Sequence, residues 1–387
     1  MLMAPHRHFQ FSRSEMSLRE KFWHVSWSFV ALITIVCSIG FMTLYSAANG
    51  KMSPWASHQM VHYLAGMTVM LTVAVVDIRS WMRWSYVLYG IALVLLIAVQ
   101  IKGSVLKGGQ RWIDFGFIQL QPSEIMKITL VLALSRYFHG ASYQEVGRPL
   151  FLVPPVLMIL VPVALVFKQP DLGTAMMLAF AAAGLLFLAG VRIWKFTLVL
   201  AAAGAVAPVA WKFMRDYLKN RILTFLNPES DPLGTGYHIL QSKIALGSGG
   251  VFGKGFMQGT QSHLDFLPEK QTDFIFTMLA EEWGLVGGIL LLGLYTLILV
   301  YGYALSMKSR NHFGRLVGLG LTTTFFFYVF INVAMVMGLV PVVGVPLPLI
   351  SYGGTAMLTL MFGFGLIMSV YIHRDVHIGR RGASDDV

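Results

Sequence analysis

Long apolar runs recur along the whole sequence, and they constrain the fold more than any other feature. About 20 apolar residues are needed for a helix to cross the roughly 30 Å hydrocarbon core of a bilayer. Runs of this kind predict spans at residues 25–47, 59–77, 84–101, 123–138, 151–167, 173–190, 193–211, 274–305, 314–338 and 354–372. A soluble domain normally carries about 25% charged residues, whereas this chain carries 12% and is 56% hydrophobic. The sequence therefore predicts an all-α polytopic membrane protein of about ten transmembrane helices.

Positive charges follow alternate connections and orient the predicted spans. Lys and Arg are enriched in the short cytoplasmic loops of membrane proteins. In this chain they gather before the first span and after every second span, at Arg7, Arg13, Arg19, Lys21, Arg79, Arg83, Arg136, Arg148, Arg192, Lys195, Lys308, Arg310, Arg315, Arg374, Arg380 and Arg381. We therefore expect a multi-pass protein with both termini in the cytoplasm. The net charge of +11 reflects this sidedness, so no nucleic-acid partner is expected.

The connection at residues 212–273, between the seventh and eighth predicted spans, is much longer than the others. Ordinary connections have a median length of about 4–6 residues, and longer ones are usually functional or disordered. Residues 237–246 give a partly amphipathic stretch suited to lying on the membrane face, with its apolar positions at Tyr237, Leu240, Ile244 and Leu246. The connection also carries several cations, and long loops translocate largely regardless of charge. We expect a structured loop outside the cell membrane that suits a phosphate-bearing lipid head group.

Several ionisable residues lie near the predicted outer ends of the spans, and such residues are functional candidates by default. Glu124 and Lys127 are three residues apart on one helix face, which predicts an internal ion pair and leaves Lys127 able to face a ligand. Asp171 precedes an apolar helix, where it could act as an N-cap. The alternative is that Asp171 faces a shared outer cavity and holds a divalent cation beside a phosphate. The sequence leaves both interpretations of each position open.

The segment at residues 265–284 is the densest in chemically interesting residues. We expect Asp273 to begin the eighth helix, either as its N-cap or as a functional carboxylate, and Thr272 could provide the cap instead. Glu281 and Glu282 fall in the part of this helix that we expect to project above the bilayer or to line a cavity.

Two other features exclude simple functions. The stretch GSGGVFGKG at residues 247–255 is not a phosphate-binding P-loop, because Ser248 replaces its first glycine and Gly255 replaces its Ser or Thr. We expect it to be a flexible loop that lets the backbone approach a ligand. Cys37 is the only cysteine, which excludes a disulfide, an iron–sulfur cluster and a cysteine zinc site.

Five long motifs resemble one known family, and the resemblance covers about residues 25 to 372. They are QRWIDFGFIQLQPSEIMKI, QPDLGTAM, NRILTFLNPESDPLGTGYHILQSKIALGSGG, FLPEKQTDFIF and GVPLPLISYGG. Together they resemble the SEDS family, and GTQS followed by FLPEKQTDF is more similar to its cell-elongation members than to its division members. The resemblance implies a cytoplasmic segment at residues 1–24, a SEDS glycosyltransferase domain at 25–372 that includes a large periplasmic loop at 212–273, and a cytoplasmic tail at 373–387.

The family resemblance also implies a function and a set of site residues. It implies an inverting peptidoglycan glycosyltransferase that joins lipid II, an undecaprenyl-pyrophosphate-linked disaccharide-pentapeptide, into glycan strands. This reaction would take place on the outer face of the bacterial inner membrane during cell elongation and rod-shape maintenance. The implied partners are a class B penicillin-binding protein and the elongation machinery. By motif match, the essential carboxylate falls on Asp273, and the cavity residues fall on Arg111, Lys127, Asp171 and Arg221.

These residue types fit the implied chemistry. A positioned carboxylate can take the proton of an attacking sugar hydroxyl, and we expect Asp273 to do so. Arg111, Lys127 and Arg221 are suited to stabilise the negative charge of a departing pyrophosphate. Asp171 could hold Mg²⁺ or Mn²⁺ against the phosphates, and no organic cofactor is expected.

Two other classes of protein, a flippase and a structural scaffold, fit part of the sequence. A flippase for the same lipid-linked precursor would also need many spans and intramembrane charge. However, a flippase needs polar access from both faces, and the candidate charges here cluster on the predicted outer side. A purely structural scaffold would leave Asp273, Asp171 and Arg221 unexplained. The clustering therefore favours an enzyme.

Overall fold

The computed structural model describes residues 16–379 except 107–108, 115, 117–118, 215, 232–233, 265 and 267–268. Within this described part, a helix lies at each predicted span. In chain order these helices are α2 (Trp27–Ala47), α3 (Trp55–Val75), α4 (Ile78–Lys102), α5 (Pro122–His139), α7 (Val153–Lys168), α8 (Leu172–Leu188), α9 (Ile193–Phe213), α13 (Ile275–Met307), α14 (His312–Val336) and α15 (Gly354–Ile372). By length and composition, 7 of the described helical stretches can cross a membrane, and they contain α2, α4, α7, α9, α13, α14 and α15. The chain is a mostly helical integral membrane protein.

The helices begin where short polar residues or proline favour a first turn. The Asp77 carboxylate accepts a hydrogen bond from the backbone N–H of Arg79 at 2.7 Å and caps α4. Asn311 caps α14 in the same way through the N–H of Gly314, at 2.6 Å. Pro122 lies in the first turn of α5, where its missing N–H leaves no helical bond unmade. Shorter helical segments flank the long helices: α1 (Leu18–Trp23), α6 (Tyr143–Gly147) and the 3-10 turn η1 (Leu150–Leu152).

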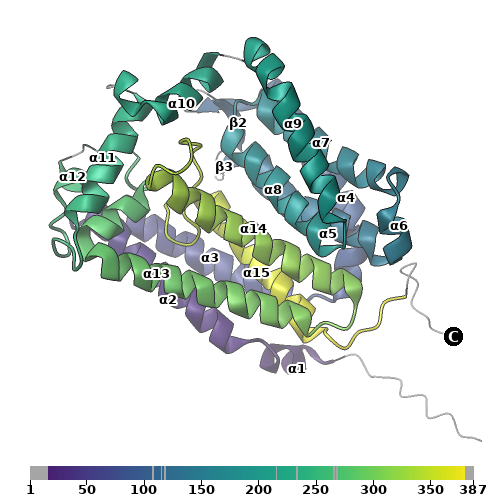
Figure 1. The fold of residues 1–387 in the computed structure, drawn as a ribbon. Helices are drawn as coiled ribbons and strands as arrows, with labels where there is room; N and C mark the ends of the chain where they lie inside the picture. Colours follow the sequence, from purple (N-terminus) through teal and green to yellow (C-terminus); the bar gives the residue numbers. More distant parts are fainter. Residues whose placement is uncertain are drawn as a thin grey trace, which may run out of the picture.

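Helix α14 lies at the centre of the bundle and α9 lies at its edge (Figure 1). Of the apolar stretch of α14, 72% is buried, because α14 packs against α13, α8, α5 and α15. Near the opposite ends of the sequence, α3 and α15 pack closely against each other. Glycine permits this approach, since a side-chain carbon at Gly365 would lie 2.7 Å from the backbone oxygen of Met70.

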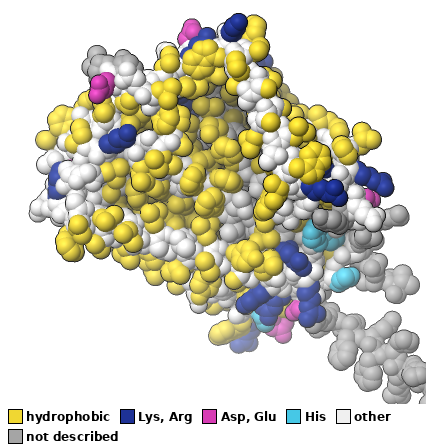
Figure 2. All heavy atoms as spheres, viewed as in Figure 1, with side chains coloured by type: hydrophobic (Ala, Val, Ile, Leu, Met, Phe, Trp, Pro, Cys, Tyr) yellow, Lys and Arg dark blue, Asp and Glu magenta, His cyan; other side chains and the backbone are white. Residues whose placement is uncertain are grey.

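Hydrophobic side chains cover most of the face seen in Figure 2, and charged side chains gather toward its edges. The same view shows a hollow between α9 and the helices around α14. Many large apolar side chains on α4, α7, α9 and α13 are exposed. This distribution is typical of a surface in contact with lipid rather than water.

A small antiparallel sheet interrupts the all-α architecture, and the sequence did not predict it. Its strands are β1 (Ser104–Leu106), β2 (Gly109–Asp114) and β3 (Gln119–Leu120), in the order β1-β2-β3. The strands are short and lie in the connection between α4 and α5, so they leave no long period-two pattern to detect. The prediction of an all-α architecture therefore holds for the long helices but misses this connection.

The segment between α9 and α13 is structured, as the sequence predicted. It contains α10 (Asp216–Leu226), the 3-10 turn η2 (Pro228–Ser230), α11 (Thr235–Ser248) and α12 (Thr260–His263). Ile239, Ser242 and Ala245 are buried where α11 packs on α13, whereas Ile244 is exposed. Figure 1 shows this segment and β2 at the same end of the molecule, which we call the loop end. That α11 lies on the membrane face stays a prediction.

Candidate functional site

Asp171 caps helix α8 at the loop end, which confirms one of the two roles that the sequence allowed. Its carboxylate accepts hydrogen bonds from the Thr174 N–H at 3.2 Å and from the Thr174 hydroxyl at 3.0 Å. The Gln121 amide also donates to it, at 3.5 Å. Asp171 is only 4% exposed. The carboxylate is therefore held from several sides and has a fixed orientation.

Arg111 reaches Asp171 from strand β2. Its Nε lies 3.8 Å from Asp171 Oδ2, and its side chain is 28% exposed. The guanidinium also donates to the carbonyl oxygens of Gln169 and Pro170, in the turn that precedes α8. The structure thus brings together two of the predicted site residues, and it joins the sheet to the start of α8.

Lys127 lies on α5 in the ion pair that the sequence predicted. Its Nζ is 2.7 Å from Glu124 Oε1, and the two side chains are 3% and 5% exposed. Tyr328 of α14 completes the group: its hydroxyl contacts Lys127 and donates to Glu124 Oε2 at 2.7 Å. Sequence reasoning missed Tyr328, because nothing in the local pattern links positions 201 residues apart. Glu124 offsets the Lys127 charge, so the ion-pair role is confirmed, and a ligand role for Lys127 stays a prediction.

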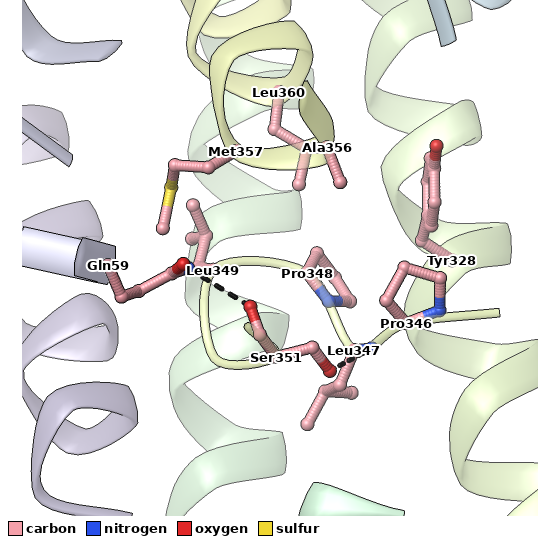
Figure 3. Close-up of a pocket in the computed structure, with 10 residues that line it drawn as sticks. All are labelled: Gln59, Tyr328, Pro346, Leu347, Pro348, Leu349, Ser351, Ala356, Met357 and Leu360. Carbon is pink, nitrogen blue, oxygen red and sulfur yellow. Dashed lines mark hydrogen bonds between the residues drawn. The ribbon is translucent and has the colours of Figure 1, made fainter. Parts of the chain in front are cut away.

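Two small cavities adjoin this group. One holds about 10 Å³ and is lined by Tyr328 and the Pro346–Leu349 loop, with Gln59 and Ser351 on its other side (Figure 3). The other holds about 30 Å³ and is lined by Lys127, Tyr328 and mostly apolar residues of α14 and α15. Each is of the size that takes at most one or two water molecules.

Asp273 lies in a turn just before α13 rather than in the helix. The helix begins at Ile275 with Phe274 in the N-cap position, so the prediction that Asp273 begins or caps the helix was wrong. The carbonyl oxygen of Asp273 accepts a hydrogen bond from the Asn332 amide at 2.9 Å. A side-chain carbon at Gly344 would lie 3.4 Å from Asp273 Oδ2, so the carboxylate faces the loop after α14. Asp273 therefore has an environment that helix capping does not explain.

One short segment, residues 343–345, lies between the two predicted carboxylates, Asp171 and Asp273. On one side, a side-chain carbon at Gly173 would lie only 2.5 Å from the Val343 carbonyl oxygen, which shows how closely the start of α8 approaches. On the other side, Gly344 faces Asp273. The starts of α8 and α13 thus meet the same loop, and the fold brings Asp171 and Asp273 into one region.

Arg221 lies on α10, and its side chain is half-buried. Figure 1 shows α10 crossing the loop end above the long helices, at the same end as β2. Helix α10 packs against η2 and α11 rather than against the α5–α8 pair. Arg221 therefore lies in a different layer of the loop end than Arg111 and Lys127 do.

His238 of α11 lies near Phe274, the residue after Asp273, and sequence reasoning did not single it out. Its ring centroid lies 6.2 Å from that of Phe274. Burial lowers the pKa of His238, and the charge of Asp231 partly opposes this change. The imidazole is therefore mainly neutral near pH 7, beside the turn that carries Asp273.

Glu281 and Glu282 lie in a second polar group, which anchors the glycine-rich loop to α13. Lys254 pairs with Glu281 at 2.7 Å, and His263 lies 3.2 Å from Glu282. A side-chain carbon at Gly253 would lie 2.1 Å from the Glu282 carbonyl oxygen. The glycines therefore permit close approach to the chain's own helix, and an approach of this loop to a ligand stays a prediction.

The comparisons with known proteins agree with this architecture. The family model for FtsW, RodA and SpoVE, described as cell cycle proteins, matches residues 22–376. Peptidoglycan glycosyltransferase MrdB of Escherichia coli strain K12 is 41% identical over 362 residues, which cover 92% of this chain and 96% of MrdB.

Solved structures give the same result. A chain from a peptidoglycan synthase complex that coordinates polymerization and crosslinking superposes with a TM-score of 0.79 at 32% identity, covering 90% of this chain and 98% of that chain. The rod shape determining protein RodA of Thermus thermophilus superposes with a TM-score of 0.69 at 28% identity, covering 91% of this chain and 98% of RodA.

The fold and the site together define a polytopic helical membrane protein that gathers buried ionisable residues at one end of its bundle. The chain belongs to the FtsW/RodA/SpoVE family, which is the SEDS family that its motifs resemble.

Proposed function

We propose that this chain is a peptidoglycan glycosyltransferase that polymerises lipid II into glycan strands during cell elongation and rod-shape maintenance. The observation that carries the proposal is the 41% identity to MrdB, a peptidoglycan glycosyltransferase, over nearly the full length of both chains. An enzyme that joins sugar units must hold a base, a donor and an acceptor in one region. The meeting of the α8 and α13 starts at residues 343–345 supplies such a region.

The proposed topology has ten transmembrane helices, both termini in the cytoplasm and residues 212–273 outside. The helix found at each predicted span supports this topology, together with the alternation of Lys and Arg along the connections. The proposed boundaries are residues 1–24, 25–372 and 373–387. Reporter fusions test the orientation: a cytoplasmic signal from a fusion at residue 240 would reverse it and remove the roles proposed below.

In the proposed reaction, Asp273 is the general base. The 4-hydroxyl oxygen of the acceptor sugar attacks the anomeric carbon of the donor and loses its proton to the Asp273 carboxylate. The bond from the anomeric carbon to the pyrophosphate oxygen breaks, and the polyprenyl pyrophosphate leaves with that electron pair. A single direct displacement inverts the anomeric centre, so a second carboxylate is not needed as a nucleophile. The position of Asp273 Oδ2 beside Gly344 supports the role, because it places the carboxylate at the loop that also meets the start of α8.

The proposed role of Arg111, Lys127 and Arg221 is to stabilise the pyrophosphate as its negative charge grows. Arg111 is held by Asp171 and by two carbonyl groups, which fixes its guanidinium before substrate arrives. Asp171 thus acts through Arg111 in this proposal. Lys127 shares its charge with Glu124, so its contribution is expected to be smaller than that of Arg111.

The sequence suggested a divalent cation at Asp171, but no step of the proposed reaction depends on it. Mg²⁺ and Mn²⁺ favour octahedral sites of oxygen ligands. At Asp171 the neighbouring groups are mostly donors, namely the Thr174 N–H and hydroxyl, the Gln121 amide and the Arg111 guanidinium. Among the described residues, no group of three or more His, Cys, Asp or Glu side chains could hold a metal ion. The residues at Asp171 therefore do not fit a cation site well.

The proposed partners are lipid II, a class B penicillin-binding protein and the elongation machinery. Similarity to a chain of a peptidoglycan synthase complex that coordinates polymerization and crosslinking supports a cross-linking partner. The proposed location is the bacterial inner membrane, with lipid II used on its outer face.

Purified protein, incubated with lipid II alone or with the penicillin-binding protein, tests the function through the length of the glycan product. We expect polymer from the complex and far less from the complex carrying Asp273→Asn. The flippase alternative predicts a different result. The unchanged protein and Asp273→Asn would both move lipid II across the membrane of a vesicle, and neither would form polymer.

A further inference from the structure

Three successive carbonyl groups in the turn that carries Asp273 are held by distant parts of the chain. The Gln271 oxygen accepts from the Tyr352 N–H at 2.9 Å, and the Thr272 oxygen accepts from the Ser351 hydroxyl at 2.6 Å. The Asp273 oxygen accepts from the Asn332 amide at 2.9 Å. These carbonyls precede α13 and cannot be satisfied by its helical ladder. Hydrogen bonds from other parts of the chain therefore hold each of these three residues of the turn.

Asn332 joins the two backbone segments that lie on either side of the Asp273 carboxylate. It lies on the last two turns of α14 and is fully buried. Its Nδ2 donates to the Asp273 oxygen and, at 2.7 Å, to the Val345 oxygen. Both partners are carbonyl oxygens that can only accept, so the nitrogen must face them. Val345 follows Gly344, which faces Asp273 Oδ2. One amide group therefore sets the distance between the turn and the loop that flank the carboxylate.

Ser351 holds the same turn from the other direction. Its hydroxyl donates to the Thr272 oxygen and accepts from the Leu347 N–H at 2.7 Å. Figure 3 shows Ser351 beside Gln59 of α3, whose amide nitrogen donates to the Ser351 carbonyl oxygen at 3.0 Å. Gln59 also accepts from the Gly353 N–H at 3.2 Å. The hydroxyl therefore joins the turn to a loop that is itself fixed to α3.

We propose that Asn332 and Ser351 are positioning residues that set the carboxylate of Asp273 for proton transfer. This inference rests on the proposed function, since it assigns the residues that orient its base. A general base must lie within hydrogen-bond reach of the proton that it takes, and a misplacement of about 1 Å can cost about a hundredfold in rate. The turn has no helical bonds through these carbonyls, so its position depends on these two side chains together with the Tyr352 N–H.

The test measures kcat and KM for lipid II in the complex with the penicillin-binding protein. Asn332→Leu keeps a similar volume and removes both amide donors, and Ser351→Ala removes the hydroxyl. We expect each to lower kcat by roughly ten- to a hundredfold with little change in KM. Ser351→Thr retains the hydroxyl and should restore much of kcat.

Matched controls separate positioning from folding. Ser369→Ala removes a buried hydroxyl that donates to the Val76 oxygen at 2.7 Å, near the opposite end of the bundle. Asn311→Leu removes a buried amide at the other end of α14. Both should lower the thermal midpoint about as much as the test variants do, while kcat stays near that of the unchanged protein.

A second readout uses the base itself. If Ser351 acts only through Asp273, Ser351→Ala should cause no further loss in protein that already carries Asp273→Asn, because residues that act as a unit are not additive. The inference is wrong if Asn332→Leu and Ser351→Ala both have a normal kcat while the unchanged protein is active and Asp273→Asn has lost most of its activity. The proposed function would still stand in that case. Absence of polymer from the unchanged complex overturns the function instead.

Discussion

Helices α9 and α14 are both apolar enough to cross a membrane, yet they pack in opposite ways. Of the apolar stretch of α14, 72% is buried, whereas 0% of that of α9 is buried. Helix α14 packs against four long helices and carries Tyr328 and Asn332, which reach Lys127 and Asp273. Helix α9 has no polar side chain between Thr197 and Lys212. Apolarity thus decides which segments enter the bilayer, and in this pair the buried helix is the one that carries polar side chains within its apolar stretch.

The largest expected effect is found by comparing two carboxylates. The turn that carries Asp273 is held by α14, whereas Asp216 lies just after α9. Asp273→Asn keeps the size of the side chain but cannot accept a proton, so polymerisation should fall by roughly a hundred- to ten-thousand-fold. Asp216→Asn, at the exposed start of α10, should leave the rate unchanged. Glycan synthesis from purified complexes measures both. Normal synthesis by Asp273→Asn would remove the proposed base.

A smaller effect is expected from the cations proposed to stabilise the pyrophosphate. Arg111→Ala and Arg221→Ala should each weaken lipid II turnover, since a hydrogen bond to a charged group contributes about 1.5–3 kcal/mol. Arg111→Lys should restore only part, because Lys lacks the planar fork of the guanidinium. Lys212→Ala on α9 is the control. If the Arg111→Ala complex turns over lipid II as fast as the control does, Arg111 only holds the turn before α8.

Stability gives the most direct comparison of the two helices. A side-chain carbon at Gly318 of α14 would lie 2.2 Å from the Ser306 hydroxyl oxygen, while at Gly204 of α9 it would meet nothing described within 4 Å. Gly318→Ala should therefore cost about 1–3 kcal/mol through overpacking. Gly204→Ala should stabilise its helix by about 0.5–1 kcal/mol. Thermal unfolding in detergent compares them, and equal midpoints would contradict the difference in packing.

The smallest effect is expected from metal removal. The groups around Asp171 are mostly hydrogen-bond donors, so EDTA should leave the rate of polymerisation unchanged. The measurement is the rate of glycan synthesis with chelator and after adding Mg²⁺ or Mn²⁺. Inhibition by EDTA that either ion reverses would establish the cation that the sequence suggested.

The positions of the helices were predictable, because hydrophobic length is a local property of the chain. The prediction at residues 354–372 coincides with α15, and that at 314–338 differs from α14 by two residues at each end. The cap at Asp171 and the Glu124–Lys127 pair were also predictable, since their partners lie three residues away. Each of these features depends on spacing within a single element.

The parts that were missed depend on contacts between elements. Tyr328 and Asn332 act on residues of α5 and of the turn before α13, and no spacing rule joins them. Asp273 looked like a helix cap because an acidic residue precedes an apolar run, but the helix begins later at Ile275. The glycine-rich loop was predicted to approach a ligand because glycine permits close approach of the backbone. Glycine does not specify which group is approached, and here it is helix α13. Sequence therefore predicted the helices and the local pairs better than it predicted the contacts between elements.

The packing of α3 against α15 has a consequence for biosynthesis. A chain emerges from the ribosome from its N-terminus, so α3 enters the membrane long before α15 has been translated. Gln59 can bond to Ser351 and Gly353 only after that last part of the chain has arrived. The turn that carries Asp273 depends on Ser351, so the nascent protein cannot complete its site until its final helix inserts. Premature release of the chain before residue 354 should therefore give an inserted but inactive product, which the cell's membrane proteases can remove.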